Sequence, residues 1–192
     1  MPKLFIIAGC NGAGKTTASY SILPEILNCR EFVNADEIAK GLSPFQPETV
    51  SIQAGRIMLH RIQFLLDSKA DFGFETTLAT RSYLQLIKRA KSKGYEVSLL
   101  FFWLESPEMA VQRVKERVMK GGHNIPQETI IRRYWAGIEN FNTIFAPEVD
   151  EWILIQNSNP TPEIIAEKRL YTEIQVLQPE LYTHIQYGKS KI

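Results

Sequence analysis

Short apolar runs alternate along the chain with longer stretches in which apolar residues recur at helical spacing. Apolar runs predict strands at residues 4–8, 32–33, 72–76, 96–104 and 152–155. Amphipathic spacing predicts helices at residues 48–68, 82–93, 107–120 and 126–145, with another beginning near Gly14. The run from Glu96 to Leu104 is apolar over most of its length, which is typical of a strand buried on both faces. This alternation predicts an α/β fold with a doubly wound parallel sheet between helices, a three-layer sandwich.

The end of the chain is expected to add short elements to this core. Residues 164–168 and 171–176 are predicted as short strands, and residues 179–185 as a short helix. We find no linker, repeat or low-complexity segment, so residues 1–192 are expected to form one domain. No apolar run approaches the length of a membrane span.

The segment between the first predicted strand and the first predicted helix carries the strongest chemical signal. Residues Gly9–Thr16 read G-C-N-G-A-G-K-T and match the phosphate-binding pattern G-x-x-x-x-G-K-[ST]. Its glycines let backbone N–H groups surround a polyphosphate, and the following helix adds the positive end of its dipole. Lys15 can reach the β- and γ-phosphates, and the Thr16 hydroxyl can ligate Mg²⁺. The residues expected to hold the nucleotide are Gly9, Asn11, Gly12, Ala13, Gly14, Lys15, Thr16 and Thr17.

Composition and charge narrow the class of protein further. The two cysteines, Cys10 and Cys29, do not form a disulfide framework, which favours a reducing cytoplasm. Cys10 is interpreted as a small residue filling the loop rather than a catalytic thiol. The net charge of +1 argues against bulk nucleic-acid binding, although residues 81–133 hold eleven Lys and Arg against five Asp and Glu. This basic third is either a nucleic-acid-binding face or a set of arginines around the phosphate groups that are transferred. The phosphate loop favours the second interpretation.

Acidic residues follow the second predicted strand and end the third, at the sheet edge where ligands of parallel sheets bind. A kinase needs a carboxylate to accept the proton of the attacking hydroxyl, and Asp36 is our candidate for that base. The alternative is that Asp36 caps the following helix. Glu37, Glu75 and Thr76 are candidates for acceptor binding, and Glu75 is also a candidate for orienting Mg²⁺ through water. A solvated strand end is the alternative for Glu75.

A cluster of arginines surrounds the glycine-rich segment at residues 121–122. Arg113 and Arg117 share one helix face, and Arg132 and Arg133 lie on the next helix. Arginines on a closing lid, here residues 118–130, can stabilise charge that develops on the γ-phosphate, and we assign this role to Arg113, Arg117 and Arg132. The alternative is a solvated basic face. His123 is expected to be structural or to touch the acceptor, and Asn157 is expected to contact the nucleotide base.

Taken together, these segments resemble the zeta toxin family of P-loop kinases over about residues 4–160. The matching blocks are Gly9–Thr17, Phe32–Ala39, Phe74–Leu78, Arg113–Val118, Gly121–Pro126 and Arg132–Tyr134. The resemblance implies an ATP-dependent phosphotransferase whose studied toxin members phosphorylate the sugar 3′-hydroxyl of a UDP-N-acetylamino sugar. It also implies a base at Asp36, phosphate stabilisation by lid arginines and a small antitoxin partner. The corner Gln156-Asn157-Ser158 lacks an aspartate that nearby branches often carry.

The sequence thus predicts a cytoplasmic kinase that uses ATP and Mg²⁺ to phosphorylate a hydroxyl of a small molecule, for which a nucleotide sugar is one candidate. One alternative is a nucleic-acid end kinase, which would use the basic middle third, or a nucleoside kinase. Another is a nucleotide-binding switch with slow hydrolysis, which would need no catalytic base such as Asp36. The acceptor, the oligomeric state and the preference for ATP over GTP are left open.

Overall fold

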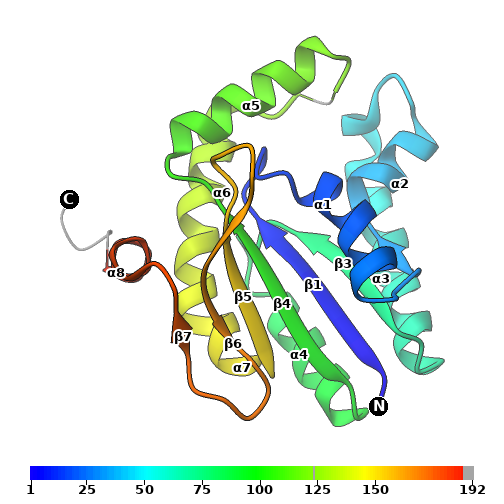
Figure 1. Cartoon of the computed structure of the whole chain (residues 1–192). Helices are drawn as coiled ribbons and strands as arrows, with labels where there is room; N and C mark the ends of the chain where they lie inside the picture. The colour runs from blue at the N-terminus through cyan, green and yellow to red at the C-terminus, as the bar shows by residue number, and fades with distance from the viewer. Residues whose placement is uncertain (123, 188–192) are drawn as a thin grey trace.

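A central sheet carries helices on both faces (Figure 1). The structure is a computed structural model that describes residues 1–122 and 124–187. The strands are β1 (Lys3–Gly9), β2 (Phe32–Val33), β3 (Phe72–Thr76), β4 (Glu96–Trp103), β5 (Glu151–Gln156), β6 (Glu163–Lys168) and β7 (Gln175–Val176). The helices are α1 (Lys15–Ser21), α2 (Ala35–Leu42), α3 (Ser51–Asp67), α4 (Tyr83–Ser92), α5 (Pro107–Met119), α6 (Gln127–Asn140), α7 (Ala146–Glu148) and α8 (Pro179–Tyr187).

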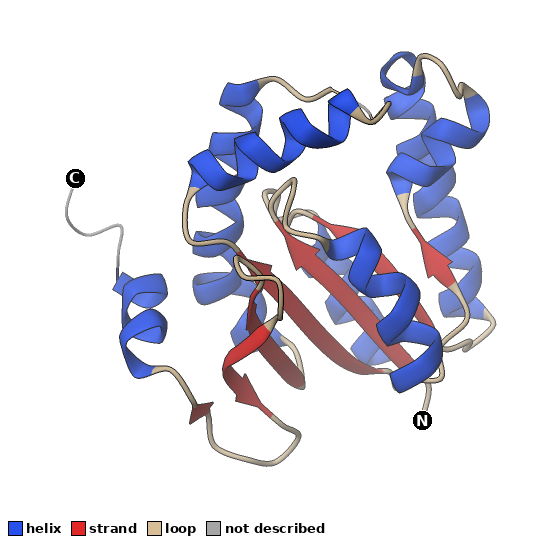
Figure 2. Cartoon of the chain, turned by 45° about the horizontal axis from the view of Figure 1, so that its top comes forward, coloured by secondary structure: helices blue, strands red, loops and turns tan. Residues whose placement is uncertain are grey.

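The sheet has the strand order β2-β3-β1-β4-β5-β6-β7, with β1 paired to both β3 and β4 in parallel. This places the carboxyl ends of β1, β2 and β3 side by side, which is where the predicted site residues lie. α1 lies on one face of the sheet, whereas α4, α6 and α7 lie on the other (Figure 2). Both faces of β4 are buried, which explains its apolar sequence; Leu99, Phe101 and Phe102 are each at most 2% exposed.

The predicted α/β class is confirmed, and the sheet departs from a fully parallel one only at one edge. β5 and β6 are antiparallel, as are β6 and β7. Residues 157–162 join β5 to β6, and a loop of this length is too short for the crossover that a parallel neighbour requires. Of the predicted strand at residues 171–176, only Gln175–Val176 pairs in the sheet.

Two predicted helices are subdivided in the structure. The predicted helix at 48–68 begins with a 3₁₀ turn, Pro47–Val50, before α3. The predicted helix at 126–145 ends its α-helical part at Asn140 and continues as a π-helical turn, Phe141–Phe145. A second π-helical turn, Ile22–Ile26, follows α1. Among the described residues, no helix combines the length and apolar character needed to cross a membrane.

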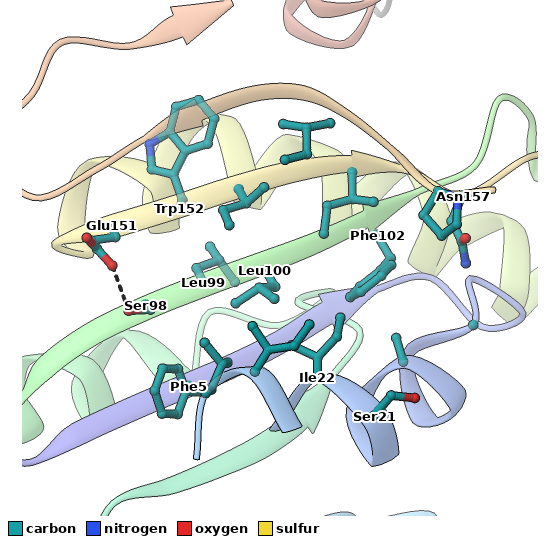
Figure 3. A pocket seen from close by; sticks show the side chains of 18 of the residues that line it. Phe5, Ser21, Ile22, Ser98, Leu99, Leu100, Phe102, Glu151, Trp152 and Asn157 are labelled. Carbon is teal, nitrogen blue, oxygen red and sulfur yellow. Dashed lines mark hydrogen bonds between the residues drawn. The ribbon is translucent and has the colours of Figure 1, made fainter. Parts of the chain in front are cut away.

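The face of the sheet beside α1 is only partly covered. An open hollow of about 920 Å³ lies there, between α1 and the segment that leads into β6 (Figure 3). Its floor includes Phe5, Leu100, Phe102 and Ile153 from the three central strands, and Ile22 lines its α1 side. We call this feature the sheet hollow. One end of it reaches Gly14, Thr17 and Asn157 at the carboxyl edge of the sheet.

Candidate functional site

The predicted phosphate loop joins β1 to α1 at the carboxyl edge of the sheet. Gly9, the last residue of β1, has a φ of 139°. A Cβ atom built on Gly9 would lie 2.3 Å from the carbonyl oxygen of Phe102, so β4 passes too close for any other residue. The loop therefore begins where only glycine permits both this backbone conformation and this packing.

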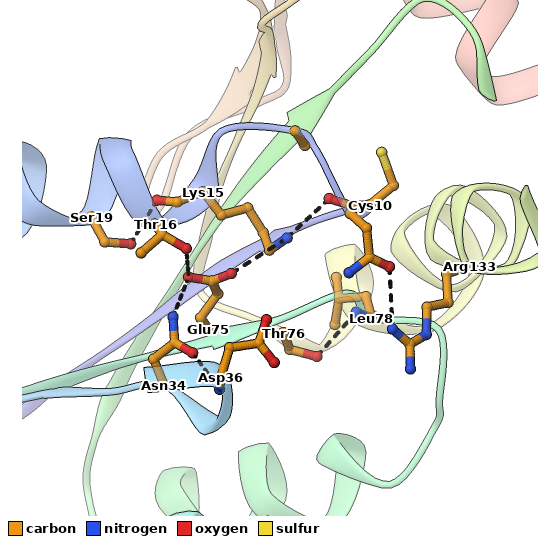
Figure 4. A network of polar contacts seen from close by, with 12 residues as sticks. Cys10, Lys15, Thr16, Ser19, Asn34, Asp36, Glu75, Thr76, Leu78 and Arg133 are labelled. Carbon is orange, nitrogen blue, oxygen red and sulfur yellow. Dashed lines mark hydrogen bonds and ion pairs between the residues drawn. The ribbon is translucent and has the colours of Figure 1, made fainter. Parts of the chain in front are cut away.

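Lys15 is the first residue of α1, and its side chain is buried beneath the loop (Figure 4). Its Nζ donates to the carbonyl oxygen of Cys10 at 2.9 Å and lies 3.5 Å from Oε1 of Glu75. The backbone acceptor and the carboxylate together compensate the buried ammonium. A positive charge is thus held at the loop before any phosphate enters.

Glu75, at the carboxyl end of β3, connects the loop to the neighbouring strand. Its Oε2 accepts hydrogen bonds from Thr16 Oγ1 and from Asn34 Nδ2, each at 2.7 Å (Figure 4). The structure therefore brings the side chains of Lys15, Thr16 and Glu75 together at the loop. Asn34 is a further functional candidate, to which the sequence pattern alone assigned no role.

Asn34 also settles how α2 begins. Its Oδ1 accepts hydrogen bonds from the backbone N–H groups of Asp36 at 2.8 Å and Glu37 at 3.3 Å. Asn34 is therefore the N-cap, and the alternative in which Asp36 caps this helix is wrong. Asp36 instead lies in the first turn, with its side chain exposed.

Two adjoining cavities meet at Asp36. A cavity of about 180 Å³ at the phosphate loop is lined by Lys15, Thr16 and Glu75. A neighbouring cavity of about 260 Å³ lies against α2 and is lined by Glu37, Lys40 and Ser51, among others. We call these the phosphate cavity and the acceptor cavity. Thr16, Asp36 and Arg117 line both cavities, so they occupy the boundary between them.

Arg117 is held at this boundary by the way α5 ends. The N–H of Gly122 donates to the carbonyl of Arg117 at 2.9 Å, and the N–H of Gly121 donates to that of Val118 at 2.9 Å. With Gly121 at a φ of 85°, these two bonds form a Schellman ending. The predicted helix end before Gly121 therefore has a definite geometry, and this geometry fixes the last turn of α5, which carries Arg117.

Of the two arginines on α6, it is Arg133 that reaches the phosphate loop. Its Nη1 donates to Oδ1 of Asn11 at 3.2 Å (Figure 4). Burial lowers the pKa of Arg133, and the nearby Arg132 lowers it further, whereas Asp36 raises it. Arg132, which the sequence analysis selected from this pair, is exposed. The sequence alone could not show which of the two arginines faces the loop, because that depends on how α6 is rotated about its own axis.

The remaining predicted residues are placed as follows. Arg113 lines the phosphate cavity and donates to the carbonyls of Asn157 and Ser158 at 2.8 and 2.9 Å. Thr76 is buried, and its Oγ1 accepts from the N–H of Leu78 at 3.1 Å, in the turn after β3. Glu37 pairs with Lys40 at 2.6 Å on the wall of the acceptor cavity. His123 lies outside the described residues.

Cys10 is buried within the phosphate loop, and burial raises the pKa of its thiol to about 11 despite the nearby Lys15. The thiol is therefore protonated at neutral pH, which supports the interpretation of Cys10 as a loop-filling residue.

The donor set at the loop suits a magnesium–nucleotide complex. The Thr16 hydroxyl and the Glu75 carboxylate are hard oxygen donors 2.7 Å apart, which is the ligand type that Mg²⁺ prefers. Among the described residues, no group of three or more His, Cys, Asp or Glu side chains gathers to hold a metal.

Comparisons with known proteins find sequences similar to this chain. The family model of zeta toxins matches residues 1–167. An uncharacterized protein of Haemophilus influenzae is 31% identical over 132 residues, which cover 69% of this chain and 92% of that protein.

Solved structures show the same fold at low identity. A chain of the AvrRxo1-ORF1:-ORF2 complex with ATP has a TM-score of 0.76 at 19% identity; the match covers 97% of this chain and 64% of that one. A chain of the PezAT chromosomal toxin–antitoxin system of Streptococcus pneumoniae has a TM-score of 0.69 at 15% identity, covering 98% of this chain and 79% of that one. Since the family model matches most of its length, the chain belongs to the zeta toxin family.

Proposed function

We propose that this protein transfers the γ-phosphoryl group of ATP to a hydroxyl of a small molecule. The observation that carries the proposal is the position of Asp36, which lines both the phosphate cavity and the acceptor cavity. A protein that only binds nucleotides needs no carboxylate at such a boundary, whereas phosphoryl transfer needs a group to accept the proton of the attacking hydroxyl.

In this proposal the loop Gly9–Thr16 holds the phosphates, with Lys15 facing the β- and γ-phosphates. The acceptor hydroxyl enters from the acceptor cavity, its proton passes to the carboxylate of Asp36, and its oxygen forms the new bond to the γ-phosphorus as ADP leaves. Arg117 and Arg133 stabilise the negative charge that spreads over the γ-phosphate oxygens. Bound Mg²⁺, held by Thr16 and oriented by Glu75, would supply further charge neutralisation at the phosphates.

The size and polarity of the acceptor cavity bear on the kind of acceptor. At about 260 Å³, lined by Glu37, Lys40 and Ser51, it offers carboxylate, ammonium and hydroxyl partners to a polyhydroxylated molecule. A nucleotide sugar that places only its sugar there is therefore a suitable candidate.

A transfer screen with labelled ATP tests the proposal. The acceptors are nucleotide sugars, free sugars, nucleosides and oligonucleotides, and Lys15→Ala is the negative control because it removes the charge facing the phosphates. We expect labelled product with a hydroxyl-bearing small molecule. ATP binding without transfer to any acceptor would favour a nucleotide-binding switch, and transfer confined to oligonucleotides would favour a nucleic-acid end kinase.

We also propose that a small antitoxin protein binds this chain. The support is family membership together with the PezAT neighbour, which is named as a toxin–antitoxin system. Expression of the chain alone in a bacterial host should arrest growth, and Asp36→Asn should relieve the arrest. Unimpaired growth at verified expression of the unmodified chain would contradict a toxic role.

A further inference from the structure

Asn157, in the turn after β5, makes a contact that the sequence analysis did not anticipate. Its Nδ2 donates to the carbonyl oxygen of Ala13 in the phosphate loop at 2.7 Å. Figure 3 shows Asn157 at the end of the sheet hollow that adjoins this loop. The amide is thus committed to the protein's own backbone rather than turned toward a nucleotide base.

The contact has a direct consequence for the loop because the peptide bond between Ala13 and Gly14 is a planar trans unit. In such a unit the C=O and the N–H point in opposite directions. Holding the Ala13 carbonyl toward Asn157 therefore turns the N–H of Gly14 to the other side, away from Asn157. A phosphate-binding loop works by presenting such N–H groups to its ligand.

Gly14 is the residue that permits this contact. Its φ is 82°, and a Cβ atom built on it would lie 2.5 Å from Nδ2 of Asn157. The glycine at this position is thus required by the approach of Asn157 as well as by the backbone conformation of the loop.

Arg113 holds the backbone of the turn that contains Asn157. Its two terminal nitrogens donate to the successive carbonyls of Asn157 and Ser158 at 2.8 and 2.9 Å. The planar guanidinium presents two N–H donors in a fixed fork, a geometry that the ammonium group of lysine does not reproduce. The corner is anchored on its other sides too, since the N–H of Asn157 donates to Trp103 O and the Ser158 hydroxyl accepts from the N–H of Glu105, each at 2.9 Å.

We propose that Arg113 and Asn157 are positioning residues that brace the phosphate loop in its phosphate-binding conformation. Arg113 on α5 orients the corner after β5, and Asn157 in that corner orients the peptide between Ala13 and Gly14. This inference deepens the proposed function. It rests on that function only for the identity of the ligand whose phosphates the loop binds. It replaces the expectation that Asn157 reads the nucleotide base.

The decisive comparison uses two ligands, ATP and inorganic tripolyphosphate, which shares the phosphates but has no base. For Asn157→Ala we expect the dissociation constants of both ligands to rise by about the same factor, roughly 3- to 10-fold, as for the loss of one hydrogen bond. Both constants are measured by calorimetry. Asn159→Ala is the matched control, because Asn159 lies exposed in the same turn, and both of its constants should remain unchanged.

A second variant guards against misfolding. Arg113→Lys keeps the positive charge but loses the fork, so it should weaken both ligands in parallel, whereas exposed Lys115→Ala on the same helix should not. If a variant bound ATP more weakly but tripolyphosphate as tightly as the unmodified protein, the brace would be overturned. Asn157 would then again be the candidate for contacting the nucleotide base. Unchanged binding of both ligands in folded variants would overturn it as well. If the unmodified protein bound tripolyphosphate but not ATP, the proposed function would fail while the brace could still be judged.

Discussion

Asp36 is the residue on which the choice between an enzyme and a switch depends. Because Asn34 caps α2, the side chain of Asp36 is not needed to start the helix. We expect Asp36→Asn to reduce phosphoryl transfer by roughly 10²–10⁴-fold, since an amide cannot accept the proton. ATP affinity should stay within about twofold, because the loop Gly9–Thr16 holds the phosphates. Both quantities can be measured on one preparation, by labelled transfer and by calorimetry. Transfer at the unmodified rate would pass the role of base to Glu37 or Glu75.

Arg117 lies at the boundary of the two cavities and should act on charge that develops during transfer. We expect Arg117→Ala to lower turnover by at least about tenfold, with a smaller change in the Michaelis constant for ATP. Steady-state kinetics with both substrates varied provide the measurement. Lys115→Ala is the control, since Lys115 is exposed on the same helix. A change confined to the Michaelis constant would make Arg117 a ground-state binding residue.

Cys10 offers a pH-dependent test of how tightly the phosphate loop is packed. A thiol pKa of about 11 leaves about 0.1% thiolate at pH 8, against about 10% for a thiol at the ordinary value of 9.0. Alkylation of Cys10 by iodoacetamide should therefore be slow at pH 8 and should accelerate about tenfold per pH unit toward pH 11. Peptide mapping by mass spectrometry separates Cys10 from Cys29. A rate that levels off near pH 9 would show that the loop exposes the thiol.

Among the helices, α2 depends on a single side chain for both its start and its link to the site. Asn34 caps α2 through Oδ1 and holds Glu75 through Nδ2. We expect Asn34→Ala to lower the free energy of unfolding by about 1–3 kcal/mol, because it removes a cap and a part-buried hydrogen bond to a carboxylate. Asn34→Ser, which restores the cap without the amide donor, should recover about 1 kcal/mol. Urea denaturation measures both, and equal stability of all three proteins would contradict the dual role.

The phosphate loop could be predicted from the sequence because its chemistry lies in consecutive residues. The strands at 4–8, 32–33 and 72–76 were also predictable, since short apolar runs bounded by polar residues form local patterns. The contributions of Asn34, Arg133 and Asn157 could not be predicted in this way. Each depends on a contact with a residue 41, 122 or 144 positions away, which only the assembled sheet brings close. The antiparallel edge was missed because an apolar run such as β6 does not reveal its direction.

At the scale of the whole molecule, the carboxyl edge of the sheet gathers the site from distant parts of the chain. Gly9, Asn34 and Glu75 come from three adjacent strand ends, and α5 and α6 bring arginines over them. In the proposed function, acceptor and nucleotide meet where these separate elements converge. Such a site is assembled only when the sheet is complete, so nucleotide binding should be lost together with the cooperative unfolding of the sheet rather than before it.

The sheet hollow has a practical consequence for anyone measuring the stability of this protein. An open apolar hollow of about 920 Å³ should admit an environment-sensitive dye such as anilinonaphthalene sulfonate while the chain is fully folded. Dye fluorescence is then expected to be high at the start of a thermal melt and to obscure the transition. Trp103 and Trp152 are each 3% exposed and would report unfolding instead through their intrinsic emission. Dye fluorescence of the native protein no greater than that of dye in buffer would show that the hollow is closed in solution.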